Sequence, residues 1–126
     1  MRAVDTNVLV RLLTRDDPKQ AAAADAFVRP GAWISHLVLV ECSWVLTSVY
    51  GSTPAKLATA LSMLLEHESL VIQDADVVEA ALQHFRATPS LGFSDCLILE
   101  VARKAGHRPL GTFDRALSKL GGAQRL

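Results

Sequence analysis

The sequence predicts an α/β fold in which a mostly parallel central sheet lies between two layers of helices, a three-layer α/β/α sandwich. Two observations lead to this prediction. Short apolar runs alternate with helical patterns from one end of the 126-residue chain to the other, and this alternation is typical of a parallel sheet that helices cover on both faces. The chain also contains no internal repeat and no linker-like stretch. We therefore expect a single domain over residues 1–126.

Strands are expected where short apolar runs stop at polar or turn-forming residues. They cover residues 3–5, 32–35, 69–73, 108–112 and 123–126, the last as an edge strand. Helices are expected between them, at residues 7–14, 18–29, 36–50, 54–67, 77–87, 94–106 and 113–120. Because only a short turn joins the third and fourth helices, we expect these two to form a helical hairpin.

Capping residues define the expected helix boundaries. Asp17-Pro18 and Thr53-Pro54 each place an N-cap residue before a proline at the first helical position, an arrangement that starts helices. The other expected boundaries are the N-terminal residues Ser35, Asp74 or Asp76, and Ser94, and the C-terminal glycines Gly51 and Gly106.

Composition excludes several classes of protein. The net charge is 0 at pH 7 and half of the residues are hydrophobic, which argues against indiscriminate binding to polyanions. No apolar run approaches the length of a membrane span, and the N-terminus does not have the pattern of a signal peptide, so we expect a cytoplasmic protein with no membrane contact. Cys42 and Cys96 are too few for a disulfide framework or a zinc site, and we expect small buried thiols.

Charge is unevenly distributed along the chain. Residues 60–100 carry seven acids against the single base Arg86, whereas residues 101–126 carry six bases against the single acid Asp114. The six bases are Arg103, Lys104, Arg108, Arg115, Lys119 and Arg125. Such a basic segment is typical either of solvated helix faces or of a patch that contacts nucleic-acid phosphates.

Three acids are expected at one edge of the sheet. Asp5 follows the first strand, Asp114 follows the strand at 108–112, and Asp95 begins a helix after a loop. Taken singly, each has an alternative explanation as a helix cap or as a complement to a helix dipole. Functional sites in open parallel sheets form beyond the carboxyl ends of strands, so the three together indicate a site at this edge.

A fourth acid, Glu41, stands in a very apolar helix. Its neighbours three and four positions away are Leu37, Val38, Trp44 and Val45. We expect its carboxylate to be at least partly buried, and therefore to need a cation or a hydrogen-bond donor nearby. The alternative to a functional role is a core salt bridge to an arginine.

Four carboxylates in one cleft require a compensating cation. Two carboxylates about 4 Å apart repel by about 4 kcal/mol at an effective dielectric constant of about 20. An all-oxygen site suits Mg²⁺ or Mn²⁺ better than zinc, and such sites typically activate water for attack on phosphorus. The motifs of other chemistries (G-x-S-x-G, the P-loop, G-x-G-x-x-G and H-E-x-x-H) are absent. The four histidines, which we expect at the surface or at caps, are His36, His67, His84 and His107.

These motifs resemble those of PIN-domain ribonucleases, and most closely those of the VapC-type toxins of bacterial toxin–antitoxin pairs. The resemblance spans essentially the whole chain and rests on AVDTNVLV, SHLVLVE, GFSD and GTFD. It implies a PIN-like fold and an endoribonuclease that uses metal-activated water to cleave RNA phosphodiester bonds. The residues that it implies as catalytic ligands of Mg²⁺ or Mn²⁺ are Asp5, Glu41, Asp95 and Asp114, and those that orient carboxylates and water are Thr6, Asn7 and Thr112.

The resemblance also implies partners: an RNA substrate, a second copy of the chain in a homodimer, and a VapB-like antitoxin whose C-terminal segment blocks the site. The bases expected to hold RNA phosphates are Arg108, Arg115 and Lys119. The hairpin at 36–66, with Trp44, Tyr50 and Met63, is either a partner surface or simple core packing.

Alternative functions fit the residues less well. A haloacid-dehalogenase-like phosphoryl-transfer enzyme would need a second acid two residues after Asp5, where Asn7 stands. A phosphorylated receiver module would need an acid after a middle strand and a lysine after a later one, and the sequence lacks a clear version of that arrangement. A catalytically inactive interaction domain is disfavoured because all four acids are intact.

Overall fold

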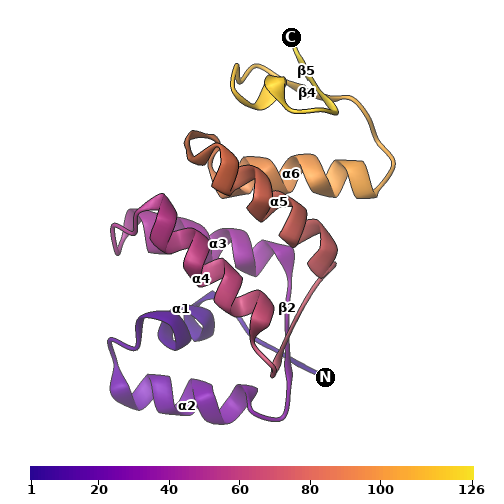
Figure 1. Ribbon diagram of the computed structural model, residues 1–126. Coiled ribbons are helices and arrows are strands. Elements are labelled where there is room, and N and C mark those ends of the chain that lie inside the picture. The colour runs from indigo at the N-terminus through magenta and orange to yellow at the C-terminus, as the bar shows by residue number, and fades with distance from the viewer. The chain divides into compact units, whose positions relative to one another are not determined.

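The computed structural model describes residues 1–126 and divides into two compact units, Met1–Ala75 and Asp76–Leu126 (Figure 1). Each unit contains helices and its own small sheet, and every strand pair in both sheets is parallel. The predicted α/β class with parallel strands is therefore confirmed. The strands form one three-stranded and one two-stranded hydrogen-bonded ladder.

The first unit contains three strands and four helices. The strands, in sheet order, are β1 (Arg2–Ala3), β2 (Ala32–Ile34) and β3 (Leu70–Ile72). The helices are α1 (Thr6–Thr14), α2 (Pro18–Val28), α3 (His36–Ser48) and α4 (Pro54–Glu66). Helix α1 lies between α2 and α3 (Figure 1). Leu9, Ile34 and Leu39 are fully buried and form the centre of the core, where their apolar surface is removed from water.

Local capping chemistry determines where these helices begin. Asp17, Ser35 and Thr53 each accept a hydrogen bond at the side chain from a backbone N–H of the first helical turn. These contacts satisfy amide groups that have no partner within the helix. The three predicted N-caps are confirmed, because such caps depend only on neighbouring residues.

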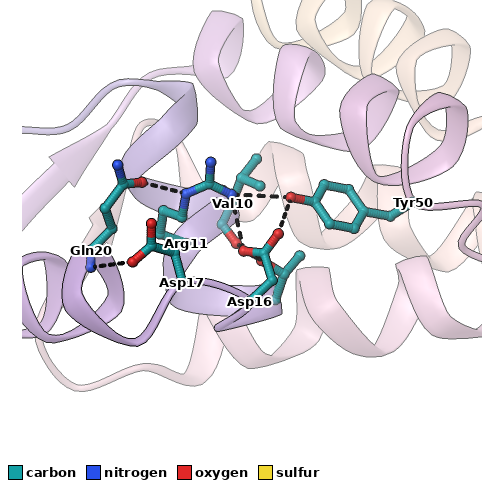
Figure 2. Close-up of polar contacts among 7 residues, drawn as sticks. Val10, Arg11, Asp16, Asp17, Gln20 and Tyr50 are labelled. Carbon is teal, nitrogen blue, oxygen red and sulfur yellow. Dashed lines mark hydrogen bonds and ion pairs between the residues drawn. The ribbon is translucent and has the colours of Figure 1, made fainter.

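A polar cluster joins α1 to the elements beside it (Figure 2). The Arg11 guanidinium donates to Gln20 Oε1 at 2.6 Å, to Asp16 Oδ1 at 3.0 Å and to the Tyr50 hydroxyl at 3.1 Å. The Tyr50 hydroxyl in turn donates to Asp16 Oδ2 at 2.8 Å and is the largest cause of the lowered pKa of that carboxyl. Arg11 thus joins α1 to Gln20 on α2, to Asp16 after the end of α1 and to Tyr50 after the end of α3. These bonds fix the orientation of α1.

The second unit contains two α-helices, two short 3₁₀ helices and two strands. They are α5 (Ala75–Ala87), η1 (Pro89–Leu91), α6 (Phe93–Lys104), β4 (Leu110–Thr112), η2 (Leu117–Lys119) and β5 (Ala123–Arg125). Within this unit, α6 lies between α5 and the β4–β5 ladder (Figure 1). The Phe85 and Phe93 rings meet edge to face with centroids 6.3 Å apart, which anchors the start of α6 on α5.

Several predicted boundaries differ from the structure; the first strand, for example, is Arg2–Ala3 and not 3–5. The helix expected at 113–120 is only the 3₁₀ turn η2, because the chain must turn back quickly to place β5 beside β4. Helix α6 begins at Phe93 after Gly92, whose φ of 76° favours glycine, and not at Ser94. The helix α3 ends at Ser48, two residues earlier than expected.

Other predictions from composition are met. Cys42 and Cys96 are buried and unpaired, and burial raises the pKa of the Cys42 thiol to about 12 and that of Cys96 to about 11. Both therefore behave as small apolar side chains. None of the helices combines the length and the apolar content that crossing a bilayer requires.

Candidate functional site

Asp5 lies between the end of β1 and the start of α1. The chain leaves the sheet through Val4, whose amide donates to the Trp33 carbonyl at 3.2 Å. Asp5 then adopts an extended backbone as the N-cap of α1, and its Oδ1 accepts a hydrogen bond from the Val8 amide at 3.2 Å. The capping role considered from the sequence is thus real. The side chain is nevertheless exposed at the carboxyl end of the strand, and it makes no other hydrogen bond.

Glu41 is joined to the residue that follows Asp5. The Thr6 hydroxyl donates to Glu41 Oε2 at 2.6 Å, across 35 positions of the sequence. A hydroxyl in this position holds the carboxylate in one orientation. The expected donor near Glu41 is therefore present, and the alternative of a core salt bridge to an arginine is not found. The first unit brings Thr6 and Glu41 together beside Asp5.

The expected burial of Glu41 was wrong, because its side chain is exposed. Helix α3 is apolar on all sides, and its buried face is formed by Leu39, Cys42, Ser43 and Leu46. The apolar neighbours of Glu41 lie on the other face, where Leu37 is 73% exposed and Trp44 is 65% exposed. On such a helix, apolar neighbours do not indicate burial.

Asn7 is exposed in the first turn of α1. No hydrogen bond joins its amide to Asp5 or Glu41. Instead it lines a cavity of about 320 Å³ between α1 and α2, together with Arg11, Gln20 and Phe27. Its expected role in orienting water or carboxylates stays a prediction.

The second unit brings the other two predicted acids close to each other. Asp114 follows β4 and caps the turn before η2, since its Oδ1 accepts from the Leu117 amide at 2.8 Å. Its own amide donates to Thr112 Oγ1 at 3.0 Å. Asp95 stands in the first turn of α6, half-buried and without a hydrogen bond. Burial, and next the charge of Asp114, raise the pKa of the Asp95 carboxyl.

The two acid pairs have no protein counter-charge. None of the four predicted acids forms an ion pair, and each unit contributes two of them. Within neither unit do three His, Cys, Asp or Glu side chains gather into a group that could hold a metal ion. The donors present are carboxylate oxygens, which suit Mg²⁺ or Mn²⁺. In the second unit a divalent cation would also relieve the repulsion that raises the Asp95 pKa.

The three bases expected to contact RNA lie in the second unit. Arg108 precedes β4, Arg115 follows Asp114, and Lys119 ends η2. All three are exposed, and none of their side chains forms an ion pair or a hydrogen bond. Their charges therefore face solvent, although their role stays a prediction.

One buried acid was missed by the sequence reasoning. Glu100 on α6 is only 7% exposed. It contacts His84 Nε2 at 2.7 Å and accepts from Arg103 Nε at 3.1 Å, and Arg103 also donates to the Gly121 carbonyl. Glu100 thus connects α5, α6 and the loop before β5. The three-residue spacing of Glu100 and Arg103 could have predicted their ion pair. The contact of Glu100 with His84 joins two helices and could not be predicted from spacing.

Comparison with known proteins places the chain in a family. No curated protein matches it. Among solved structures it is similar to the Mycobacterium tuberculosis toxin VapC20, described as cleaving the sarcin–ricin loop, with 21% identity over 97% of this chain and 96% of that one and a TM-score of 0.45. The family model described as PIN domain matches residues 2–123. That match covers nearly the whole chain and parts of both units, and it agrees with the resemblance of the motifs: the chain belongs to the PIN-domain family.

Proposed function

We propose that this protein is a divalent-metal-dependent endoribonuclease that hydrolyses RNA phosphodiester bonds in the cytoplasm, and that it is the toxin of a type II toxin–antitoxin pair. The observation that carries the proposal is membership of the PIN-domain family over residues 2–123. We propose further that the two units together make one PIN domain over residues 1–126. The VapC-type assignment rests on the sequence motifs.

The four acids would hold Mg²⁺ or Mn²⁺, which when bound activates water and stabilises the charge that develops at the phosphate. Thr6 keeps the Glu41 carboxylate oriented through its hydroxyl. Thr112 and Asp114 form a hydrogen-bonded turn that holds the Asp114 carboxylate after β4. Asp95 must lose its proton to act as a ligand, and a bound cation would offset the burial and the charge of Asp114 that raise the pKa of its carboxyl.

The products should carry 5′-phosphate and 3′-hydroxyl ends, because the 2′-hydroxyl of the substrate is not the nucleophile. Sequence-specific cleavage of RNA usually takes place in loops and single strands, where the backbone is accessible. The exposed Arg108, Arg115 and Lys119 would neutralise phosphates next to the cut site. Sequencing the RNA ends produced on induced expression would identify the substrate.

The test compares RNA cleavage with Mg²⁺ or Mn²⁺, with EDTA, and by the variant Asp5→Asn. A matched control is Asp17→Asn, because Asp17 caps α2 as Asp5 caps α1 and asparagine caps about as well as aspartate. We expect cleavage by the wild type and by Asp17→Asn with metal, and none with EDTA or by Asp5→Asn. Equal cleavage in every case would refute the metal-dependent mechanism.

The proposed partners are a VapB-like antitoxin and a second copy of the chain. In support, Trp44 on α3 and Met63 on α4 are 65% and 58% exposed, so both are available on the hairpin predicted as a contact surface. Tyr50 is less so, because its hydroxyl is engaged by Arg11 and Asp16. Co-purification with the product of an adjacent small reading frame, and the mass of the particle in solution, test the two partners separately.

A further inference from the structure

Two side chains with no assigned role lie at the carboxyl end of the β4–β5 ladder. Phe113 directly follows Thr112, the last residue of β4, and is 82% exposed. Arg125, the last residue of β5, is paired in register with Thr112. The Leu126 amide donates to the Thr112 carbonyl at 2.9 Å, which keeps the two strand ends together.

This position is next to one of the predicted acids. Residues in register on parallel strands project to the same face of the sheet, so the Arg125 and Thr112 side chains share a face. The Thr112 hydroxyl accepts the amide of Asp114, and Asp114 is close enough to Asp95 to raise its pKa. Phe113 directly precedes Asp114 in the chain, and Arg125 lies beside Thr112 at the start of the same turn.

The basic side chains that follow α6 are available to contact a ligand, whereas those at its end are not. Arg103 and Lys104, at the end of α6, are bonded to Glu100 and Asp76. In contrast, the side chains of the basic residues beyond α6 form no ion pair and no hydrogen bond: Arg108, Arg115, Lys119 and Arg125. Asp114 is the only acid in residues 101–126. The charge around Phe113 is thus complementary to a polyanion.

An exposed aromatic ring near basic side chains that form no ion pair has the chemistry of a single-strand binding surface. Proteins hold single-stranded nucleic acids by stacking bases on aromatic rings and by neutralising phosphates with basic side chains. Unpaired RNA bases are free to stack in this way, whereas paired bases are not. A single exposed phenylalanine is unremarkable alone, but here Asp114 and Arg115 follow it directly in the chain and Arg125 is paired with the residue before it.

We propose that Phe113 stacks on an unpaired RNA base and that Arg125 contacts a phosphate beside that base. The inference deepens the proposed ribonuclease function and rests on it: the two side chains would hold the single strand next to the acids of the second unit. It adds Phe113 and Arg125 to the three bases expected from the sequence to contact RNA.

The test measures binding without cleavage. The probe is a fluorescein-labelled single-stranded RNA of about 12 nucleotides, in EDTA, compared with the same sugar–phosphate backbone lacking bases. We expect Phe113→Ala to weaken binding of the RNA by about 5- to 150-fold, the range of one lost stacked base, and to leave binding of the base-free backbone unchanged. Phe113→Trp should bind as the wild type does, and Phe113→Leu, which keeps apolar area without a ring, should resemble Phe113→Ala.

Arg125 should behave differently from Phe113. We expect Arg125→Ala to weaken binding of both probes equally and to reduce the slope of log affinity against log salt by about 0.7, the value for one phosphate contact on a single strand. Matched controls are Val71→Ala, an exposed apolar side chain of the first unit, and Arg86→Ala, an exposed base of α5 without an ion pair. Both controls should bind as the wild type does.

The outcomes separate this inference from the proposed function. If the wild type cleaves RNA with metal but Phe113→Ala binds both probes normally, the stacking proposal is overturned and the ribonuclease proposal stands. If Phe113→Ala instead changes only the mass of the particle in solution, the ring belongs to a protein contact and the proposal is likewise overturned. Loss of the base-dependent preference supports stacking whether or not the metal experiment succeeds. Because Phe113 is so exposed, its removal leaves no cavity, and circular dichroism verifies folding.

Discussion

The two units each carry a pair of predicted acids, but the pairs are held in opposite ways. In the first unit, Asp5 accepts a backbone amide and Glu41 accepts the Thr6 hydroxyl. In the second unit, Asp114 accepts the Leu117 amide, whereas Asp95 accepts no hydrogen bond and lies near the charge of Asp114. Both acids of the first pair accept hydrogen bonds, whereas the second pair contains a half-buried carboxyl without one, whose pKa is raised by burial and by the charge of Asp114.

This difference indicates a division of roles. Carboxylates that accept hydrogen bonds are pre-oriented before any ligand arrives. A carboxylate that is desolvated beside a like charge raises the free energy of the metal-free protein, and a cation that binds there removes that cost. The first unit would therefore supply pre-oriented ligands, and in the second unit a bound cation would offset the cost of the Asp95 charge.

The largest expected effects come from removing one acid of each pair. Asp5→Asn and Asp95→Asn should each lower RNA cleavage by more than about 100-fold, since loss of a ligand exceeds the effect known for residues behind ligands. Their stabilities in EDTA should differ. Asp95→Asn should raise the melting temperature because it removes a disfavoured charge, whereas Asp5→Asn should leave it unchanged because asparagine still caps α1.

Calorimetry in EDTA, beside cleavage assays with Mn²⁺, measures both quantities. Addition of Mn²⁺ should raise the melting temperature of the wild type and should do so less for either variant. If Asp95→Asn and Asp5→Asn changed stability in the same direction and by the same amount, the contrast between the two pairs would be lost.

A second acid on α6 sharpens the comparison. Glu100 is more buried than Asp95, but it contacts His84 and Arg103. Removing one partner of a buried ion pair is strongly destabilising, and partial exposure of His84 and Arg103 reduces the cost. We expect Glu100→Ala to lower the free energy of unfolding by about 1–3 kcal/mol, the opposite sign to Asp95→Asn, as measured by urea denaturation. A stabilised Glu100→Ala variant would contradict the role of this contact.

The hydrogen bond that orients Glu41 gives a smaller effect. Thr6→Val keeps the shape of the side chain but removes the hydroxyl that donates to Glu41. We expect cleavage and Mn²⁺ affinity to fall by about 10-fold, the lower end of the range for residues that orient ligands. Thr6→Ser retains the donor and should stay within about twofold of the wild type. Equal activity of the two variants would show that Thr6 does not orient Glu41.

Local chemistry explains what the sequence could predict. The N-caps Asp17, Ser35 and Thr53 were found because a cap needs only its own neighbours, and the parallel α/β class followed from alternation along the chain. The position of Asp5 at the end of a strand was predictable for the same reason. Each of these features depends on residues that are adjacent in sequence.

Features that depend on distant contacts could not be predicted. Glu41 is exposed because the packing of α3, which is apolar all round, selects which face is buried. The bond from Thr6 to Glu41 spans 35 positions, and the contact of His84 with Glu100 joins two helices. Arg125 became a candidate only through its register with Thr112. In each case, pairing between elements decides the outcome, and no local pattern encodes it.

The smallest expected effect extends the contrast to a third acid of the first unit, Asp16. The Tyr50 hydroxyl, followed by the Thr14 hydroxyl, lowers the pKa of the Asp16 carboxyl below its ordinary value of 3.8 (Figure 2). A carboxyl whose pKa is lower in the folded state binds fewer protons there than in the unfolded chain. Its stabilising contribution is therefore present above that ordinary value and is lost as the pH falls through the lowered folded-state pKa.

Tyr50→Phe removes the largest cause of this shift while keeping the ring. We expect the wild type to be the more stable protein at neutral pH, and the difference in free energy of unfolding to shrink as the pH falls below about 4, because both proteins then carry a protonated Asp16. Asp16→Asn is the matched control, since it removes the titrating group, and in that background Tyr50→Phe should show no such dependence on pH. A gap between wild type and Tyr50→Phe that stays constant from neutral to acidic pH would mean that the Tyr50 hydroxyl does not stabilise the ionised carboxyl of Asp16.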